Sequence, residues 1–158
     1  MYSNEKVILE RLTVDNADFI YELYSRPELA EYFDESPFLQ NETPTEFTAR
    51  IISLCEYIFT IRPTDQPNLI IGDCALHHWN KQKKEIEIGG SLLPEYWGKG
   101  YMQSAFEILT KIATLELCAE TLFGQTKTRN LNAIRLAEKM GFEKQKSNIQ
   151  DSTFRKEI

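Results

Sequence analysis

Glycine and proline are scarce in this chain, and it has no long hydrophobic run. Its 158 residues include only 7 glycines and 6 prolines, which excludes a collagen-like repeat and a proline-rich linker. No apolar stretch approaches the length that spans a bilayer, and residues 1–6 lack the charged-then-apolar layout of a signal peptide. We therefore expect one domain over residues 1–158, in the cytoplasm, with no membrane partner.

Positive charge is in deficit as well. Lysine and arginine together number 18, against 24 aspartates and glutamates, which gives a formal net charge of −6. Binding the phosphates of a nucleic acid requires a basic surface, so this composition argues against a nucleic-acid partner. An acidic surface instead suits a cationic substrate.

Cysteine is limited to three residues, Cys55, Cys74 and Cys118. Their odd number, wide spacing and apolar neighbours are typical of buried, reduced thiols in a cytosolic protein. A disulfide framework is therefore excluded, and we expect no metal site.

The hydrophobic pattern predicts a mixed α/β sheet. Predicted strands cover residues 7–12, 57–61, 69–76, 85–88 and 121–126, and the tail has room for two more. Helical spacing predicts two or three helices between residues 16 and 54, a long one over 102–117 and another over 131–140. No repeat or linker interrupts this order.

Residues 89–102 leave a strand, pass through glycines and enter the strongest predicted helix. First-turn amides of a helix have no partner within it and carry the positive end of its dipole, so several N–H groups can bind one phosphate. Gly98 and Gly100 let the backbone approach a ligand without a Cβ. A Walker-type loop needs Ser or Thr where Gly100 stands, and a dinucleotide fingerprint needs Gly at Gln103, so both are excluded. An ordinary tight strand-to-helix connection remains the alternative to an anion site.

Two motifs give the chain a family resemblance. They are PEYWGKGY at residues 94–101 and NLNAIRLAEKMGF at residues 130–142. With these motifs the chain resembles the Gcn5-related N-acetyltransferase (GNAT) family, and within it the branch that acetylates the N-termini of ribosomal proteins. The resemblance implies a mixed, mainly antiparallel central sheet of six or seven strands, flanked by about four helices.

The resemblance also implies acetyl-CoA as cosubstrate, with no metal. The CoA pyrophosphate is expected on backbone N–H groups from Trp97 to Met102, and the pantetheine arm along a strand edge that splays at a bulge near Gly89-Gly90. The residues expected to bind the cofactor are Ser91, Leu92, Leu93, Trp97, Gly98, Lys99, Gly100, Tyr101, Met102 and Asn130.

The chain departs from the family pattern at two positions. Glu95 stands where the family often has Gln or Arg, and a carboxylate does not help to hold a pyrophosphate. Ala137 stands where many members have a tyrosine proposed to protonate the departing thiolate. The expected anion site therefore depends on main-chain amides, and no phenol is expected at the last helix.

Acetyl transfer requires a neutral amine, so a group near the site must accept a proton. Glu87 is the candidate base, because it lies on the strand 85–88 near the expected meeting point of thioester and amine. The period-two pattern of that strand places Glu85 and Glu87 on one face. A water chain is the alternative base. His77 and His78 lie on the preceding predicted strand, one facing each side, and we expect them to be structural.

Three functions are compatible with the sequence. The first is an acetyl-CoA-dependent N-acetyltransferase that acts on a small-molecule amine or a protein N-terminus, as a monomer or homodimer. The second is a catalytically inactive acyl-CoA-binding module, which the missing tyrosine allows. The third is a structural interaction domain whose glycine turn binds nothing.

Overall fold

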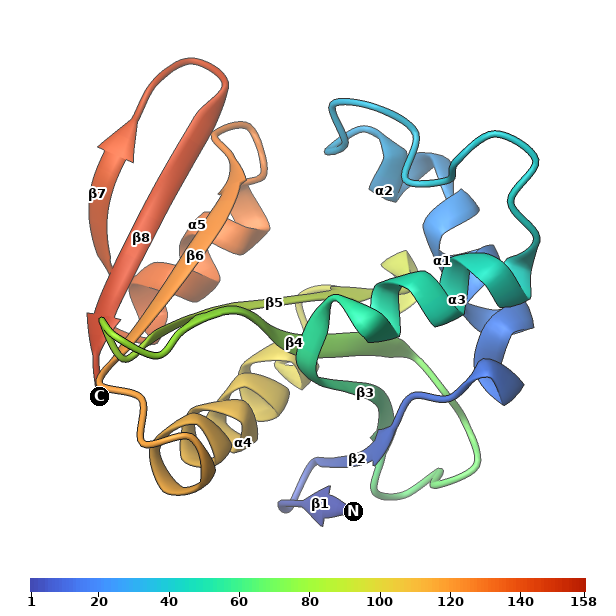
Figure 1. Cartoon of the computed structure of the whole chain (residues 1–158), viewed down its shortest axis with the longest axis horizontal. Helices are drawn as coiled ribbons and strands as arrows, with labels where there is room; N and C mark the ends of the chain where they lie inside the picture. The colour runs from blue at the N-terminus through green and yellow to red at the C-terminus, as the bar shows by residue number, and fades with distance from the viewer.

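One mixed sheet of eight strands runs through the computed structural model, which describes all 158 residues (Figure 1). The strands are β1 (Tyr2–Ser3), β2 (Val7–Arg11), β3 (Cys55–Pro63), β4 (Gly72–Asn80), β5 (Glu85–Leu92), β6 (Thr121–Lys127), β7 (Glu143–Ser147) and β8 (Asp151–Glu157). Their order across the sheet is β1-β2-β3-β4-β5-β6-β8-β7, and only the β5–β6 pair is parallel. The predicted fold class is confirmed. The strand count exceeds the expected six or seven because β1, with two residues, is too short to leave a hydrophobic pattern.

Five α-helices and two 3₁₀ turns connect the strands. They are η1 (Val14–Asn16), α1 (Ala17–Ser25), α2 (Pro27–Ala30), α3 (Pro44–Ser53), η2 (Pro94–Tyr96), α4 (Tyr101–Glu116) and α5 (Leu131–Lys139). The Thr43 side chain caps α3 by accepting a hydrogen bond from the N–H of Glu46. The Asn130 side chain caps α5 in the same way, through the N–H of Ala133. Proline occupies the first position of α2 and α3, where its missing N–H costs nothing.

The sheet carries helices on both faces, as Figure 1 shows for α4 on one side and α1 with α3 on the other. The larger core packs α4, through side chains such as Leu109, against Leu76 of β4 and Ile86 of β5. A smaller core packs Ile20 of α1 and Phe47 of α3 against the opposite face. Alternation along β5 therefore buries its isoleucines under α4 and leaves its polar side chains on the α1–α3 side.

The strands β5 and β6 pair over only three residues and then separate (Figure 1). Their last pair joins Glu87 to Phe123. The expected bulge at Gly89-Gly90 is wrong, because both glycines pair in regular register with β4. The register shift lies instead between His77 and Asn80 of β4. The splay thus arises from the end of the parallel ladder and needs no bulge in β5.

The prediction of three buried thiols is wrong for one of them. Cys74 is buried and Cys55 is partly buried, but Cys118 is exposed. It follows the end of α4 with φ at 56°, the left-handed conformation that closes many helices and turns the side chain away from the core. No helix of the structure is both long enough and apolar enough to span a bilayer.

Candidate active site

Six consecutive backbone N–H groups at the start of α4 have no acceptor within the protein. On the N-terminal side, the N–H of Trp97 donates to the Pro94 carbonyl at 3.1 Å. On the C-terminal side, the N–H of Ser104 donates to the Gly100 carbonyl at 3.1 Å. The amides of residues 98–103 lie between these bonds, and we call them the amide cradle. Trp97 of the expected set is already paired, so the free amides run from Gly98 to Gln103.

Two glycines shape the cradle. Gly98 and Gly100 have φ of 71° and 84°, which L residues rarely adopt, so glycine is required by the backbone here. A Cβ at Gly98 would meet no protein atom within 4 Å, so that side of the cradle is open. A Cβ at Gly100 would lie 3.3 Å from Nζ of Lys6. The cradle is therefore accessible to a ligand and has a cation beside it.

Two lysines and an ion pair set the charge around the cradle. The Lys6 ammonium lies over the Tyr101 ring, 5.0 Å from its centroid, and Lys99 lies over Tyr96 at 5.7 Å. The unfavourable carboxylate of Glu95 is paired with Arg26, which also bonds Glu28 at 3.0 Å, and the hydrogen bonds from Arg26 hold the pKa of Glu95 below its usual value. The cradle thus combines unpaired amides, a helix dipole and a net positive surrounding, which together favour an anion.

The predicted edge of β5 is only partly free. The N–H of Ser91 donates to Oδ1 of Asp73 at 3.1 Å, and the N–H of Leu93 donates to the Ile71 carbonyl at 2.9 Å. The Leu92 carbonyl accepts a hydrogen bond from the Trp97 indole at 2.9 Å. These bonds fasten the end of β5 to β4 and to the loop that leads into the cradle. The edge without a neighbouring strand begins at residue 88, just beyond the last pair with β6.

Asn130 stands at the start of α5, as predicted. Its Oδ1 accepts from the N–H of Ala133 at 3.3 Å, so the oxygen is occupied by the cap. Its side-chain NH₂ has no acceptor within the protein and is free to contact a ligand. Ala137 lies about two turns further along α5 and is partly buried against the larger core.

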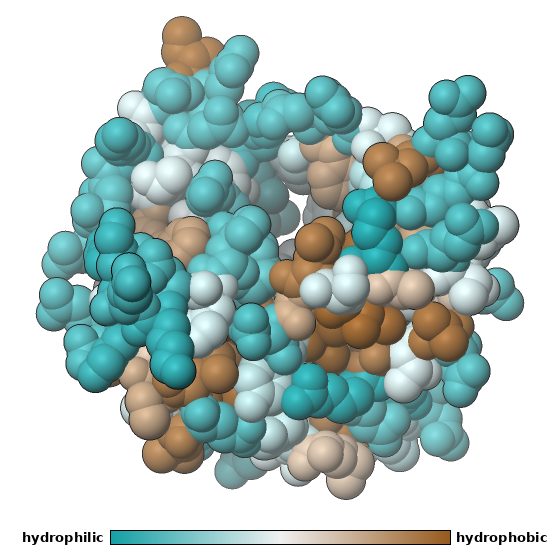
Figure 2. All heavy atoms as spheres, viewed as in Figure 1, coloured by the Kyte–Doolittle hydropathy of each residue, from teal (hydrophilic) through white to brown (hydrophobic).

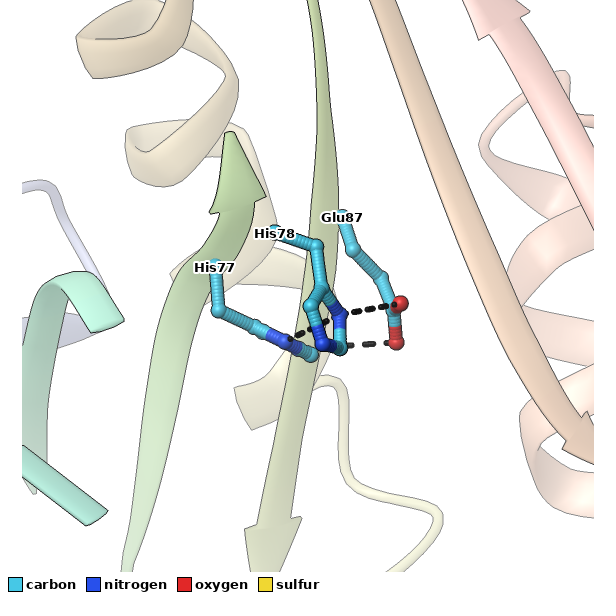
Figure 3. Close-up of side chains that lie close together, drawn as sticks. All are labelled: His77, His78 and Glu87. Atoms are coloured by element: carbon cyan, nitrogen blue, oxygen red, sulfur yellow. Dashed lines mark hydrogen bonds and ion pairs between the residues drawn. The ribbon is translucent and has the colours of Figure 1, made fainter. Parts of the chain in front are cut away.

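Glu87 meets both histidines, which the sequence placed on opposite sides of the sheet. Oε1 of Glu87 lies 3.0 Å from Nδ1 of His78, and Oε2 lies 3.5 Å from Nε2 of His77 (Figure 3). The prediction of opposed histidines is wrong because His78 adopts φ of 52° within the irregular end of β4, which breaks the period-two alternation. Burial lowers the pKa of His77, with Glu87 acting in the opposite direction. Glu85 shares the face of Glu87, as predicted, and pairs with Arg155 at 2.9 Å.

A buried carboxylate lies behind the end of β5. Asp73 is 2% exposed, and its Oδ2 accepts a hydrogen bond from the hydroxyl of Tyr24 at 2.8 Å. Burial raises the pKa of Asp73 to about 6, although the bonds from Tyr24 and from the Ser91 N–H lower it. Burial also raises the pKa of Tyr24 well above its usual value, so its hydroxyl stays protonated. This network holds α1 against the sheet directly beneath the end of β5.

A pocket of about 440 Å³ lies between α1, α2 and the loop that follows them. The lining of this pocket includes three aromatic rings and two carboxylates, which are Tyr24, Phe33, Phe38, Asp34 and Glu35. Figure 2 shows a hollow in the surface between the C-terminal hairpin and the α2 region. The loop is tied to β6, because the Lys127 ammonium bonds both Asp34 and Asp151. The aromatic rings and the carboxylate of Glu35, which has no cationic partner, suit a cation.

Sequence reasoning missed Lys6 and Arg26 as neighbours of the cradle. Neither residue is near residues 98–103 in the chain. The convergence of His77 and His78 on Glu87 was also missed, because no sequence pattern predicts a left-handed backbone conformation at His78. Only the amide cradle could be predicted from the sequence, because its residues are continuous in the chain.

Comparisons with known proteins identify similar sequences and similar folds. A sequence model of the acetyltransferase (GNAT) domain family matches residues 6–143. The uncharacterized N-acetyltransferase p20 of Bacillus licheniformis is 22% identical over 147 residues, which is 89% of this chain and 81% of that protein. Two solved structures share the fold, each covering 98% of this chain and 96% of their own. One is a GNAT-family acetyltransferase from Bacillus anthracis, with a TM-score of 0.81 and 16% identity. The other is a spermidine N-acetyltransferase from Vibrio cholerae in complex with CoA and spermine, with a TM-score of 0.80 and 20% identity.

Proposed function

The chain belongs to the acetyltransferase (GNAT) family, and on that premise we propose that it transfers an acetyl group from acetyl-CoA to a primary amine, directly and within a ternary complex. The observation that carries this proposal is the amide cradle, six unpaired N–H groups at the start of a long helix. Such donors lose hydrogen bonds when the chain folds unless water or an anion replaces them. A diphosphate supplies several acceptor oxygens at one place.

The residues present fit coenzyme A. The amides of residues 98–103 would hold its diphosphate, with Lys6 and Lys99 adding positive charge and Arg26 cancelling the charge of Glu95. The free NH₂ of Asn130 and the unpaired edge of β5 border the space between the diverging strands. Acetyl-CoA would supply the acetyl group, activated as a thioester.

Glu87 is the base in this proposal. A primary ammonium has no lone pair, so the acceptor must lose a proton before it attacks. The Glu87 carboxylate stands at the last β5–β6 pair, where the strands begin to part, and its side chain is only 13% exposed. The contacts with His77 and His78 fix its orientation. If the acceptor amine binds too far from Glu87 for direct contact, a chain of water molecules would carry its proton to the carboxylate.

The acceptor is a primary amine, and the pocket beside α2 favours one that carries further positive charge. Glu35 and the aromatic rings line that pocket, where Asp34 is already paired with Lys127, and the whole chain has a net charge of −6. A small polyamine fits this chemistry, and the spermidine enzyme of Vibrio cholerae has the same fold. A protein N-terminus, as in the ribosomal-protein branch that the sequence resembles, is the other candidate acceptor.

One observation favours a second function. Ala137 offers no group to protonate a departing thiolate, and a chain that binds acyl-CoA without turnover would need none. The catalytically inactive acyl-CoA-binding module is therefore the alternative.

A coupled pair of measurements tests the proposal. Calorimetric titration with acetyl-CoA should show binding to one site. The absence of heat at high concentration would contradict the proposal that the protein binds acetyl-CoA. Release of free thiol is then followed with polyamines, small monoamines and ribosomal-protein N-terminal peptides as acceptors. Turnover with any acceptor supports the transferase, whereas binding without turnover on every acceptor would favour the inactive module.

A further inference from the structure

Three groups with metal-ligand atoms converge where β4 and β5 meet the diverging β6. His77 and Glu87 form a cross-strand pair, and His78 follows on the irregular end of β4. One ligand atom from each of the three lies within 4.8 Å of the other two. Figure 3 shows the two imidazoles and the carboxylate turned toward a common point.

The hydrogen bonds of this cluster do not satisfy all three groups at once. Nδ1 of His78 lies 3.1 Å from Nδ1 of His77 and 3.0 Å from Oε1 of Glu87. A ring nitrogen carries either one hydrogen or one lone pair, so a single proton on His78 must be shared between two acceptors. Without that proton, its lone pair faces the carboxylate. A cation placed among the three groups would meet a lone pair from each.

The backbone holds His78 in a costly conformation to bring the rings together. Its φ of 52° lies in the left-handed region, which costs a non-glycine residue about 1 kcal/mol. A regular strand would point His78 to the opposite face from His77. The register shift between His77 and Asn80 removes that alternation and sends both imidazoles to the side of Glu87.

We propose that His77, His78 and Glu87 form a binding site for a divalent transition-metal ion of the zinc class. Two imidazoles and one carboxylate are a common ligand set for Zn²⁺, and bond lengths of about 2.0–2.2 Å place tetrahedral ligand atoms roughly 3.2–3.6 Å apart. Nδ1 of His78 lies 3.0 Å from Oε1 of Glu87 and 3.1 Å from Nδ1 of His77, close to that spacing, and one ligand atom from each of the three residues lies within 4.8 Å of the other two. The His78 side chain is 71% exposed, so the ion has an open path and a solvent molecule completes its coordination.

Metal binding has a consequence for catalysis that rests on the proposed function. A Glu87 carboxylate that coordinates a cation no longer accepts a proton from the acceptor amine. The site is therefore inhibitory, and the metal-free protein is the active form.

Metal binding is tested without acetyl-CoA, so its failure and that of the proposed function are distinguishable. The full chain carrying Cys118→Ser, which removes the exposed thiol as a competing ligand, is freed of metal with a chelator. It is titrated with Zn²⁺ by calorimetry and with Co²⁺ by visible absorption. His78→Gly removes one imidazole at a position whose backbone favours glycine, so the variant should fold. Glu87→Gln removes the carboxylate, and Glu85→Gln, on the same face, is the matched control.

One Zn²⁺ per chain and a Co²⁺ spectrum of a tetrahedral nitrogen–oxygen site are expected. Affinity should fall at least tenfold in His78→Gly and in Glu87→Gln, and remain unchanged in Glu85→Gln. Absence of binding, or equal affinity in His78→Gly and the parent, would overturn the site. For inhibition, Zn²⁺ should lower the transfer rate of the parent and spare that of His78→Gly, each relative to its own metal-free rate. Equal loss in both proteins would overturn the inhibitory role.

Discussion

Glu87 of β5 and Phe123 of β6 form the last pair of the parallel ladder, and the two strands separate directly beyond them. The pairing places the Glu87 carboxylate at the point where the two strands begin to separate. It also leaves the following residues of β5 without a neighbour on that side. The candidate base and the free strand edge therefore follow from one feature of the sheet.

The first prediction concerns that carboxylate. Glu87→Gln keeps the shape of the side chain and removes its ability to accept a proton, so kcat should fall roughly 10²-fold or more. The affinity for acetyl-CoA, measured by calorimetry, should stay the same because the cradle is untouched. Glu85→Gln serves as the control and should retain kcat. Full activity in Glu87→Gln would assign the proton to a water chain.

The second prediction concerns the glycines of the cradle. Gly98→Ala puts a methyl group on the open side of the cradle and forces alanine into φ near 71°. We expect about 1 kcal/mol loss of stability. CoA affinity should fall about tenfold, the cost of one blocked charge-assisted hydrogen bond.

Gly141→Ala is the matched control for Gly98→Ala. Gly141 has φ of 81° at the end of α5, and its Cβ would meet only the Lys156 side chain at 4.0 Å. It should lose similar stability in urea unfolding while keeping its affinity for CoA. A parallel loss of affinity in both variants would mean that backbone strain alone explains the effect.

The third prediction concerns the ion pair beside the cradle. Arg26→Met leaves the carboxylates of Glu28 and Glu95 unpaired, with Glu95 near the bound diphosphate. CoA should bind about threefold more weakly, the size expected for an exposed charge pair. The double variant Arg26→Met/Glu95→Gln removes both charges and should recover the original affinity. If the double variant binds as weakly as Arg26→Met, charge neutralisation is not the role of Arg26.

The fourth prediction concerns the buried Asp73. Its pKa is about 6 in the folded protein and 3.8 in the unfolded chain, so the folded protein binds more protons between these values. The free energy of unfolding should therefore fall as the pH rises from about 4 to about 6, by on the order of 3 kcal/mol. Asp73→Asn should flatten this slope in urea unfolding at several pH values.

Tyr24→Phe gives a second test of the same carboxylate. Its hydroxyl donates to Asp73 and lowers the pKa of that group, so its removal should extend the pH-dependent window upward. An unchanged slope in Asp73→Asn would show that another group titrates in this range.

Sequence patterns predicted most of the fold, because alternation and helical spacing are local. The runs at β2, β3, β4, β5 and β6 and the apolar stripe of α4 follow those periods. The failures have local physical causes. His78 and Cys118 adopt left-handed conformations that hydrophobic periodicity does not encode, and these invert the side-chain directions that the pattern predicts.

The candidate site was predictable only where it is continuous in sequence. Residues 98–103 form one continuous segment that leads into α4, and the absence of acceptors for first-turn amides is a general property of helices. Lys6 and Arg26 reach the same turn from distant segments, through the packing of β2 and α2. Such neighbours emerge only when the sheet is assembled.

A ¹H–¹⁵N NMR titration of the full chain with coenzyme A tests most directly whether the amides of Gly98–Gln103 hold the diphosphate. Their six resonances should shift more than those of any other segment. Pantetheine, which lacks the diphosphate, should leave them in place. Coenzyme A binding that leaves these amides unmoved, or equal shifts with pantetheine, would contradict the cradle.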